Sequence, residues 1–152
     1  MNRVIPLIAL AFSTPALAGP VVGLQTDYAA TTEKTTGPNG LGLTGRVGYG
    51  FDVGVVEIIP ELEVSWFPDT WIPKVGGRAM IGKGIEPGLF GHLLLPMWRQ
   101  SDPIRGWDAG AVIDFTAAPM VDIGLHGGAM VLDSAENRQI TPTFGVHASL
   151  SF

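Results

Sequence analysis

The chain has 152 residues, a formal net charge of −5 and charged side chains at only 15% of its positions. The negative charge argues against a nucleic-acid partner, which would require a basic patch. The chain has no cysteine, so it lacks the disulfides that stabilise most small exported domains, and another feature must hold the fold together. With 21 glycines it is a poor helix former, and no segment after the N-terminal one approaches the ~20 continuous apolar residues of a membrane helix.

The N-terminal segment has the three parts of a secretory signal peptide. Arg3 provides a positive charge, residues 4–12 form a short apolar run, and Ala16-Leu17-Ala18 is a small-residue cleavage site. The apolar run is too short to span a membrane. We therefore expect residues 1–18 to be a cleaved signal peptide and residues 19–152 to form a single domain.

Eight segments after Gly19 have strand character and are separated by turn signals. They are residues 21–30, 41–51, 53–67, 75–83, 88–98, 106–117, 120–132 and 140–152. Most have about the length of a tilted membrane strand, which is ~9–11 residues. The connections alternate between longer polar loops and tight turns, as in outer-membrane barrels. The sequence thus predicts an all-β fold, an eight-stranded antiparallel transmembrane up-and-down β-barrel.

Aromatic residues fall near the two ends of these segments. Two such bands flanking an aliphatic middle are typical of the girdles of a membrane barrel. The predicted girdle residues are Tyr28, Tyr49, Phe51, Trp66, Phe90, Trp98, Trp107, Phe115 and Phe152.

Each predicted strand has one apolar and one polar face, because side chains alternate along a strand. The polar faces contain mostly Gly, Ser and Thr with few charges, which favours a membrane barrel with a polar, side-chain-filled interior over a soluble barrel with an apolar one. The interior charge network is predicted to comprise Arg46, Glu57, Glu61, Glu63, Arg78, Asp108, Asp114, Asp122 and His126, with Asp27, His92 and His147 also facing inward.

Strand register suggests how these charges pair. A turn centred on Asp52 and Val53 would place Arg46 diagonal to Glu57 and Glu61, and Arg78 could reach Glu63. Charges inside so narrow a barrel must be paired or wetted. Two interpretations use the same residues: polar filling that keeps the lumen shut, or Glu–Arg pairs that exchange partners and gate a low-conductance, porin-like ion pore, with the histidines as pH sensors.

Catalytic and metal sites are weakly indicated. His147 and Ser149 have the His-x-Ser spacing of a lipid A hydrolase, but both lie on the predicted polar face, away from the outer leaflet. His92, His126 and His147 could form a metal cluster, although hydrogen-bonded interior histidines are the more usual case. We expect no enzyme activity, no metal and no cofactor.

The last predicted strand alternates strictly and ends on an aromatic residue, with Phe144, Val146, Leu150 and Phe152 on its apolar face. With the signal peptide, the Gly-Tyr-Gly-Phe segment at residues 48–51 and the Pro-Glu-Leu-Glu segment at residues 60–63, it resembles the small eight-stranded outer-membrane barrels of the OmpA/OmpX type. The resemblance implies location in the outer membrane of a Gram-negative envelope, and assembly by the barrel assembly machinery, which reads the C-terminal strand.

The predicted loops contain basic residues that could bind lipopolysaccharide phosphate: Lys34, Lys74, Arg99, Arg105 and Arg138. The function expected from the sequence is a structural or envelope-stability role without catalysis. The gated pore is the first alternative, and a lipid A-modifying hydrolase the second.

Overall fold

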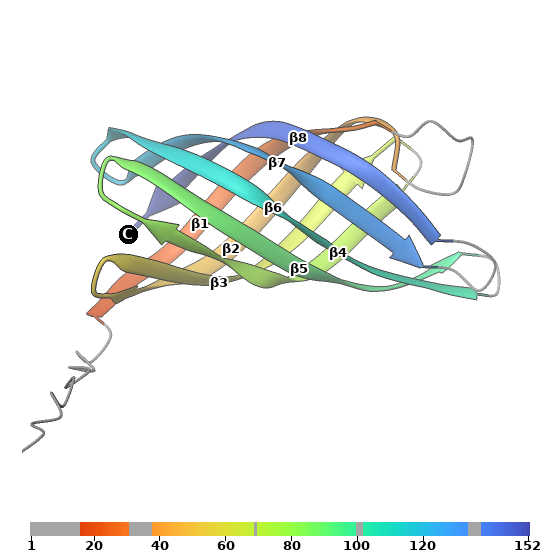
Figure 1. Cartoon of the computed structure of the whole chain (residues 1–152), viewed down its shortest axis with the longest axis horizontal. Coiled ribbons are helices and arrows are strands. Elements are labelled where there is room, and N and C mark those ends of the chain that lie inside the picture. The colour runs from red at the N-terminus through yellow and green to blue at the C-terminus, as the bar shows by residue number, and fades with distance from the viewer. Residues whose placement is uncertain (1–15, 31–37, 69, 100–101, 134–137) are drawn as a thin grey trace, which may run out of the picture.

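A computed structural model describes the backbone of residues 16–30, 38–68, 70–99, 102–133 and 138–152, and the side chains in these ranges except 16–18, 96–99 and 102–104. Eight strands follow one another along the chain (Figure 1). They are β1 (Ala16–Ala29), β2 (Gly40–Val53), β3 (Val56–Phe67), β4 (Thr70–Ile81), β5 (Ile85–Arg99), β6 (Asp102–Ala118), β7 (Val121–Asp133) and β8 (Arg138–Ser151). Among the described residues, no helix is long and apolar enough to cross a membrane.

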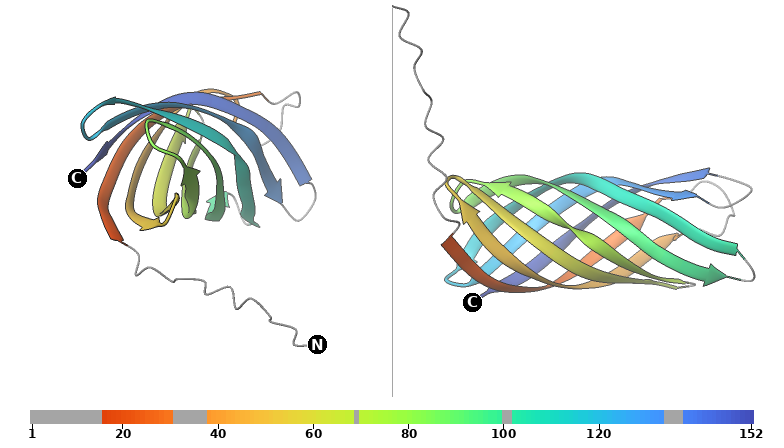
Figure 2. Two further views of the ribbon diagram at one scale, coloured as in Figure 1. Left: turned by 60° about the vertical axis from the view of Figure 1, so that its left-hand side comes forward. Right: turned by 90° about the horizontal axis from the view of Figure 1, so that it is seen from below.

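The strands form a closed antiparallel barrel in which each strand pairs with its neighbours in sequence. The C-terminal strand closes the ring, with Val21 of β1 opposite Ser151 of β8 and Ala29 opposite Thr143. Figure 2 shows the strands tilted around the barrel axis. The predicted eight-stranded antiparallel fold is therefore confirmed, and closure leaves no unpaired sheet edge.

Strand boundaries differ from those predicted in several places. β1 begins at Ala16, β4 at Thr70 and β6 at Asp102, several residues before the predicted starts at 21, 75 and 106. Trp71 pairs with Trp66, and Ile72 with Ser65, so the Trp- and Pro-containing stretch predicted as a loop continues the ladder. The predicted long loops after the third and fifth strands were wrong, because the strands extend almost to the connection.

The barrel has two distinguishable ends. At one end, called here the loop end, β1, β3, β5 and β7 finish and β2, β4, β6 and β8 begin. The tight connections after β2, β4 and β6 lie at the other end, called here the turn end. The β2–β3 turn pairs Val53 with Val56 and has Gly54 at φ 72°, a left-handed conformation that suits glycine. This turn lies two residues later than predicted, and the β2–β3 register moves with it.

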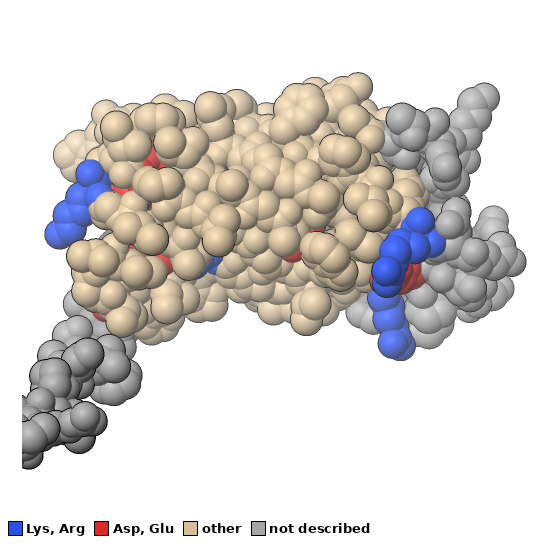
Figure 3. All heavy atoms as spheres, viewed as in Figure 1, with Lys and Arg blue, Asp and Glu red and all other residues tan. Residues whose placement is uncertain are grey.

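Apolar side chains cover the outside of the barrel. Figure 3 shows charged side chains gathered at the two ends and few between them. The exposed aliphatic residues of the wall include Val22, Leu24, Leu43, Val47, Ile58, Leu62, Val75, Leu89, Leu93, Ile123, Leu125, Val146 and Leu150. A wall this apolar would be unusual for a barrel that faces water.

Most of the predicted girdle aromatics point outward near the ends of the strands. Tyr28, Trp66, Trp107, Phe115 and Phe152 are exposed, and Tyr49 and Phe51 are half-buried on the wall with ring centroids 5.1 Å apart. The side chain of Trp98 lies outside the described residues.

Phe90 was wrongly assigned to the girdle. It lies on the inward face of β5, where it stacks on His92 with ring centroids 5.8 Å apart and packs against buried apolar residues. Strand alternation explains this placement, since Phe90 and His92 are two residues apart and share a face.

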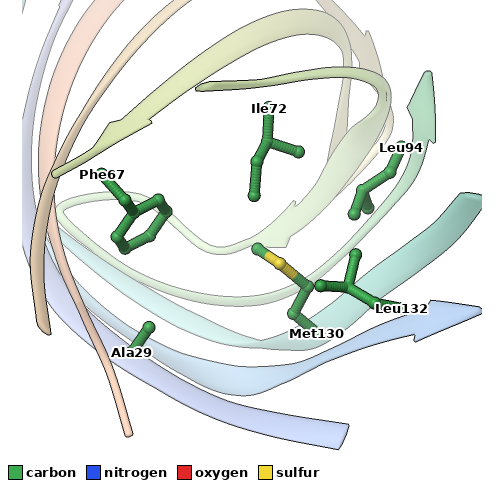
Figure 4. Packing of buried hydrophobic residues seen from close by; sticks show 6 residues of the cluster. All are labelled: Ala29, Phe67, Ile72, Leu94, Met130 and Leu132. Atoms are coloured by element: carbon green, nitrogen blue, oxygen red, sulfur yellow. The ribbon is translucent and has the colours of Figure 1, made fainter. Parts of the chain in front are cut away.

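Two layers of apolar side chains cross the lumen. The loop-end layer consists of Ala29, Phe67, Ile72, Leu94, Met130 and Leu132, which project toward one another inside the barrel (Figure 4). The second layer, nearer the turn end, consists of Val21, Ile59, Met80 and Val112 with Phe90 packed against them. Neither layer was predicted from the sequence, because the inward face was expected to be polar throughout.

Glycine on the inward face leaves room for the polar side chains. A Cβ added to Gly124 would collide with the carboxylate of Asp114 and with the ring of His147. We predict that Gly124→Ala lowers the free energy of unfolding by about 1–3 kcal/mol, because the overpacked side chains must move. Urea titration of the folded barrel in detergent checks this. Gly127→Ala is the matched control: its Cβ would meet only Thr143 O at 3.9 Å, so its unfolding midpoint should stay near that of the parent.

Candidate functional site

Buried polar side chains occupy the lumen alongside the two apolar layers. The buried ionisable residues are Asp27, Arg46, Glu61, Glu63, Lys74, Arg78, His92, Asp108, Asp114, His126 and His147. Burying so many charges is costly unless each is paired. The contacts of these residues therefore decide what the interior can do.

Asp27 is the centre of one hydrogen-bond network. Its Oδ1 accepts from Gln25 Nε2 and from His126 Nε2, both at 2.8 Å, and its Oδ2 accepts from the Thr44 hydroxyl at 2.6 Å. The Thr44 hydroxyl also lies 2.7 Å from that of Ser65. Three donors compensate the desolvation of this carboxylate.

Lys74 of β4 forms salt bridges with acidic residues of two other strands, Glu63 of β3 and Asp108 of β6. Its Nζ lies 2.7 Å from Asp108 Oδ2 and 3.4 Å from Glu63 Oε2. The His92 ring completes this group, with Nδ1 2.8 Å from Asp108 Oδ1 and Nε2 3.0 Å from Glu61 Oε1. Because an ionised carboxylate only accepts hydrogen bonds, a ring with carboxylates on both nitrogens must share an extra proton or cation with them.

Arg78 continues the network toward the turn end. Its Nε donates to Glu61 Oε2 at 3.1 Å, and its Nη1 to Asp114 Oδ2 at 3.4 Å. Asp114 in turn accepts from His147 Nε2 at 2.6 Å. A single chain of contacts therefore runs from Glu63 through Lys74, Asp108, His92, Glu61, Arg78 and Asp114 to His147.

Several predicted pairings are corrected by the register. Arg46 lies opposite Glu63 rather than diagonal to Glu57 and Glu61, because the β2–β3 turn is centred two residues later than expected. Its guanidinium instead donates to Ser149 Oγ at 3.2 Å and Gln25 Oε1 at 3.5 Å.

The cation beside Glu63 was also misidentified. Arg78 was expected to reach this glutamate, but Arg78 pairs with Glu61, and Lys74 occupies the position beside Glu63. Lys74 was predicted to lie in a loop that could bind lipopolysaccharide, but it lies on the inward face of β4. The hydrophobic alternation of residues 70–81 could have revealed it as an inward-facing residue, since Ile72, Lys74 and Arg78 share one face of β4.

Two predicted network members lie outside the sealed interior. Glu57 and Asp122 are half-buried and line an open hollow of about 680 Å³ at the turn end, together with Asp52, Glu86 and Lys83. Their distance from the barrel centre follows from their positions beside the β2–β3 and β6–β7 turns. They contribute to an acidic mouth rather than to the central network.

The central network leaves little free space. A cavity of about 20 Å³, room for about one water, is lined by residues of both networks, including Glu63, His92, His126 and His147. Among the buried side-chain atoms described, Arg46 Nε, His126 Nδ1 and His147 Nδ1 have no hydrogen-bond partner. Around this cavity, the described side chains therefore fill the interior and leave no open passage among them.

Comparisons with known proteins identify relatives by fold alone. No protein-family model matches the chain, and no curated protein is similar to it in sequence. Among solved structures, the chain is similar to Neisserial surface protein A (NspA), with 12% identity and a TM-score of 0.61 over 90% of this chain and 99% of that one. It is also similar to the de novo designed TMB2.3, with 12% identity and a TM-score of 0.53 over 90% and 95% of the two chains.

The Yersinia pestis outer membrane protein Ail aligns over 88% of this chain and 99% of its own length, with 15% identity and a TM-score of 0.45. The alignments with NspA and TMB2.3 show that the barrel fold is shared. At such low identity they transfer no residue role.

The two interior arginines provide a matched test of the network. Arg78→Gln removes the cation shared by Glu61 and Asp114, so we predict a loss of about 3–5 kcal/mol in the free energy of unfolding. Arg46→Gln removes hydrogen bonds to the neutral partners Ser149 and Gln25 but breaks no salt bridge, so it should lose less, about 1–2 kcal/mol. Urea titration in detergent measures both. Equal losses would contradict the assignment of the ion pairs to Arg78.

Proposed function

We propose that this chain is an integral barrel of the bacterial outer membrane with a closed, structural interior. The observation that carries the proposal is the inversion of its faces: the wall is aliphatic, whereas the lumen contains the buried charges. Lipid solvates such a wall, and the aromatic residues near both ends match the girdles of membrane barrels. The outward faces of Phe144, Val146, Leu150 and Phe152 are available as an assembly signal for the barrel assembly machinery.

A structural role is favoured over conduction because side chains fill the described interior. Residues of both apolar layers help to line its cavity, which has room for about one water. A conducting path would require side chains of at least one layer to move together with the ion pairs of Arg78 and Lys74. The gated pore remains the alternative, with Arg78–Glu61 as its candidate gate in place of the pairs expected for Arg46.

Catalysis on lipid A is less compatible with these contacts. His147 is bonded to Asp114 and Ser149 to Arg46, and both side chains are buried in the lumen. A lipid at the outer wall would not reach them. At the loop end, Arg105 and Arg138 are exposed and could contact lipopolysaccharide phosphate, although Arg138 already pairs with Asp133. Lys34 and Arg99, the other predicted contacts, lie outside the described side chains.

Membrane exposure of the wall can be tested by placing an arginine at two different depths along the strands. Leu62 is exposed near the middle of β3 between Val47 and Val75, whereas Leu41 lies at the loop end beside Tyr28. We predict that Leu62→Arg lowers the stability of the barrel folded in lipid vesicles by about 2–4 kcal/mol, and that Leu41→Arg lowers it by at most about 1 kcal/mol. Equal effects at the two depths would count against a membrane-spanning wall.

Conduction can be tested by recording current from the folded chain in a planar bilayer. We expect no steady openings, because two apolar layers cross the lumen. Heat-shifted gel mobility verifies that the recorded protein is folded. Steady small openings that Arg78→Gln or Glu61→Gln alters would instead establish a gated pore and reject the closed structural role.

A further inference from the structure

Three potential metal ligands converge in the centre of the polar network. Glu61, Glu63 and His92, called here the central trio, each offer one ligand atom, and these atoms lie within 4.8 Å of one another. His92 Nε2 is 3.0 Å from Glu61 Oε1 and 3.8 Å from Glu63 Oε1. Both separations are shorter than about 4.1 Å, twice a zinc–ligand distance of about 2.0–2.1 Å, as ligation of one cation by the imidazole and a carboxylate requires.

Each side chain of the central trio also makes a polar contact through its second oxygen or nitrogen atom. Arg78 Nε contacts the second oxygen of Glu61 at 3.1 Å, and Lys74 Nζ contacts the second oxygen of Glu63 at 3.4 Å. Asp108 Oδ1 accepts from the second ring nitrogen of the histidine at 2.8 Å. Protein metal sites are typically built this way, with outer partners that orient the ligands and a carboxylate on the far side of the imidazole. The glutamates therefore present only Oε1 to the centre.

One divalent cation would balance the buried charges of the interior. The buried carboxylates of the described residues outnumber the buried Lys and Arg side chains by five to three. One divalent cation would supply the two missing positive charges while the histidines stay neutral. The adjoining cavity, lined by Glu63 and His92, can hold the water that would complete a four-coordinate site.

We propose that Glu61, Glu63 and His92 bind one divalent cation of the zinc type inside the barrel. Imidazole with two carboxylates suits such a borderline cation better than Mg²⁺ or Ca²⁺, which prefer more oxygen ligands. The site differs from the cluster of His92, His126 and His147 considered from the sequence, since His126 and His147 bond to Asp27 and Asp114 instead.

The competing explanation is a proton. A proton shared between His92 and Glu61 would also produce the 3.0 Å separation, and protonated histidines would also balance the carboxylates. The two explanations differ in what the folded protein retains. A metal site retains a stoichiometric cation and loses it when a ligand is replaced, whereas a proton-balanced interior binds none.

The test uses the untagged chain folded into detergent in the presence of Zn²⁺ and freed of unbound metal by gel filtration. We expect about one Zn²⁺ per chain by elemental analysis, and a higher thermal midpoint than for protein folded with a chelator. With Mg²⁺ in place of Zn²⁺, we expect neither retained metal nor a higher thermal midpoint. His92→Gln and Glu63→Gln should each weaken Zn²⁺ binding by at least about tenfold.

His126→Gln is the matched control, because it also replaces a buried histidine that faces a carboxylate but lies outside the central trio. It should retain Zn²⁺ like the parent chain. Visible absorption of bound Co²⁺ gives a second reading in any variant that folds, shown by heat-shifted mobility. Folded parent protein without retained metal, or equal loss in His126→Gln and His92→Gln, would overturn the proposal.

Discussion

The dominant constraint on this molecule is that charges enclosed by a narrow barrel have to compensate one another. Water cannot solvate the middle of the lumen, so an unmatched ion there would cost several kcal/mol. This requirement explains why Lys74 and Arg78 each bridge two carboxylates and why Asp27 has three hydrogen-bond donors. It also explains inward glycines such as Gly124, which make space for a bonded pair where any larger side chain would separate it.

Period-two alternation was sufficient to predict the fold. It identified eight strands and assigned most side chains to the correct face, because each residue of a strand points opposite to the next. It failed for Phe90, which was grouped with other aromatics although His92, two residues away, was correctly placed inside. The alternation of residues along a strand is thus a better indicator of the face on which a side chain lies than its aromatic character. The two apolar layers were missed for a different reason, because the whole inward face was expected to be polar.

Partner assignments could not be predicted, because they depend on the register and on side-chain reach. Moving the β2–β3 turn to Gly54 places Arg46 four residues further along β3 than expected. Its side chain then extends toward Ser149 on β8, across the closure of the barrel. Alternation within one strand contains no information about such contacts. Ring closure brings together residues more than 100 positions apart, and only the three-dimensional structure shows which of them meet.

The close filling of the lumen connects stability with any function of the interior. Apolar and polar side chains pack together around the central trio, so an ion bound there could leave only if some of them moved apart. An occupant of this site would enter while the barrel closes, and its binding energy would become part of the folding energy. Its rate of exchange from the folded barrel would then report how often the layers separate. The same opening would be required of a gated pore, so a barrel that retains its occupant for long periods is also one that does not conduct.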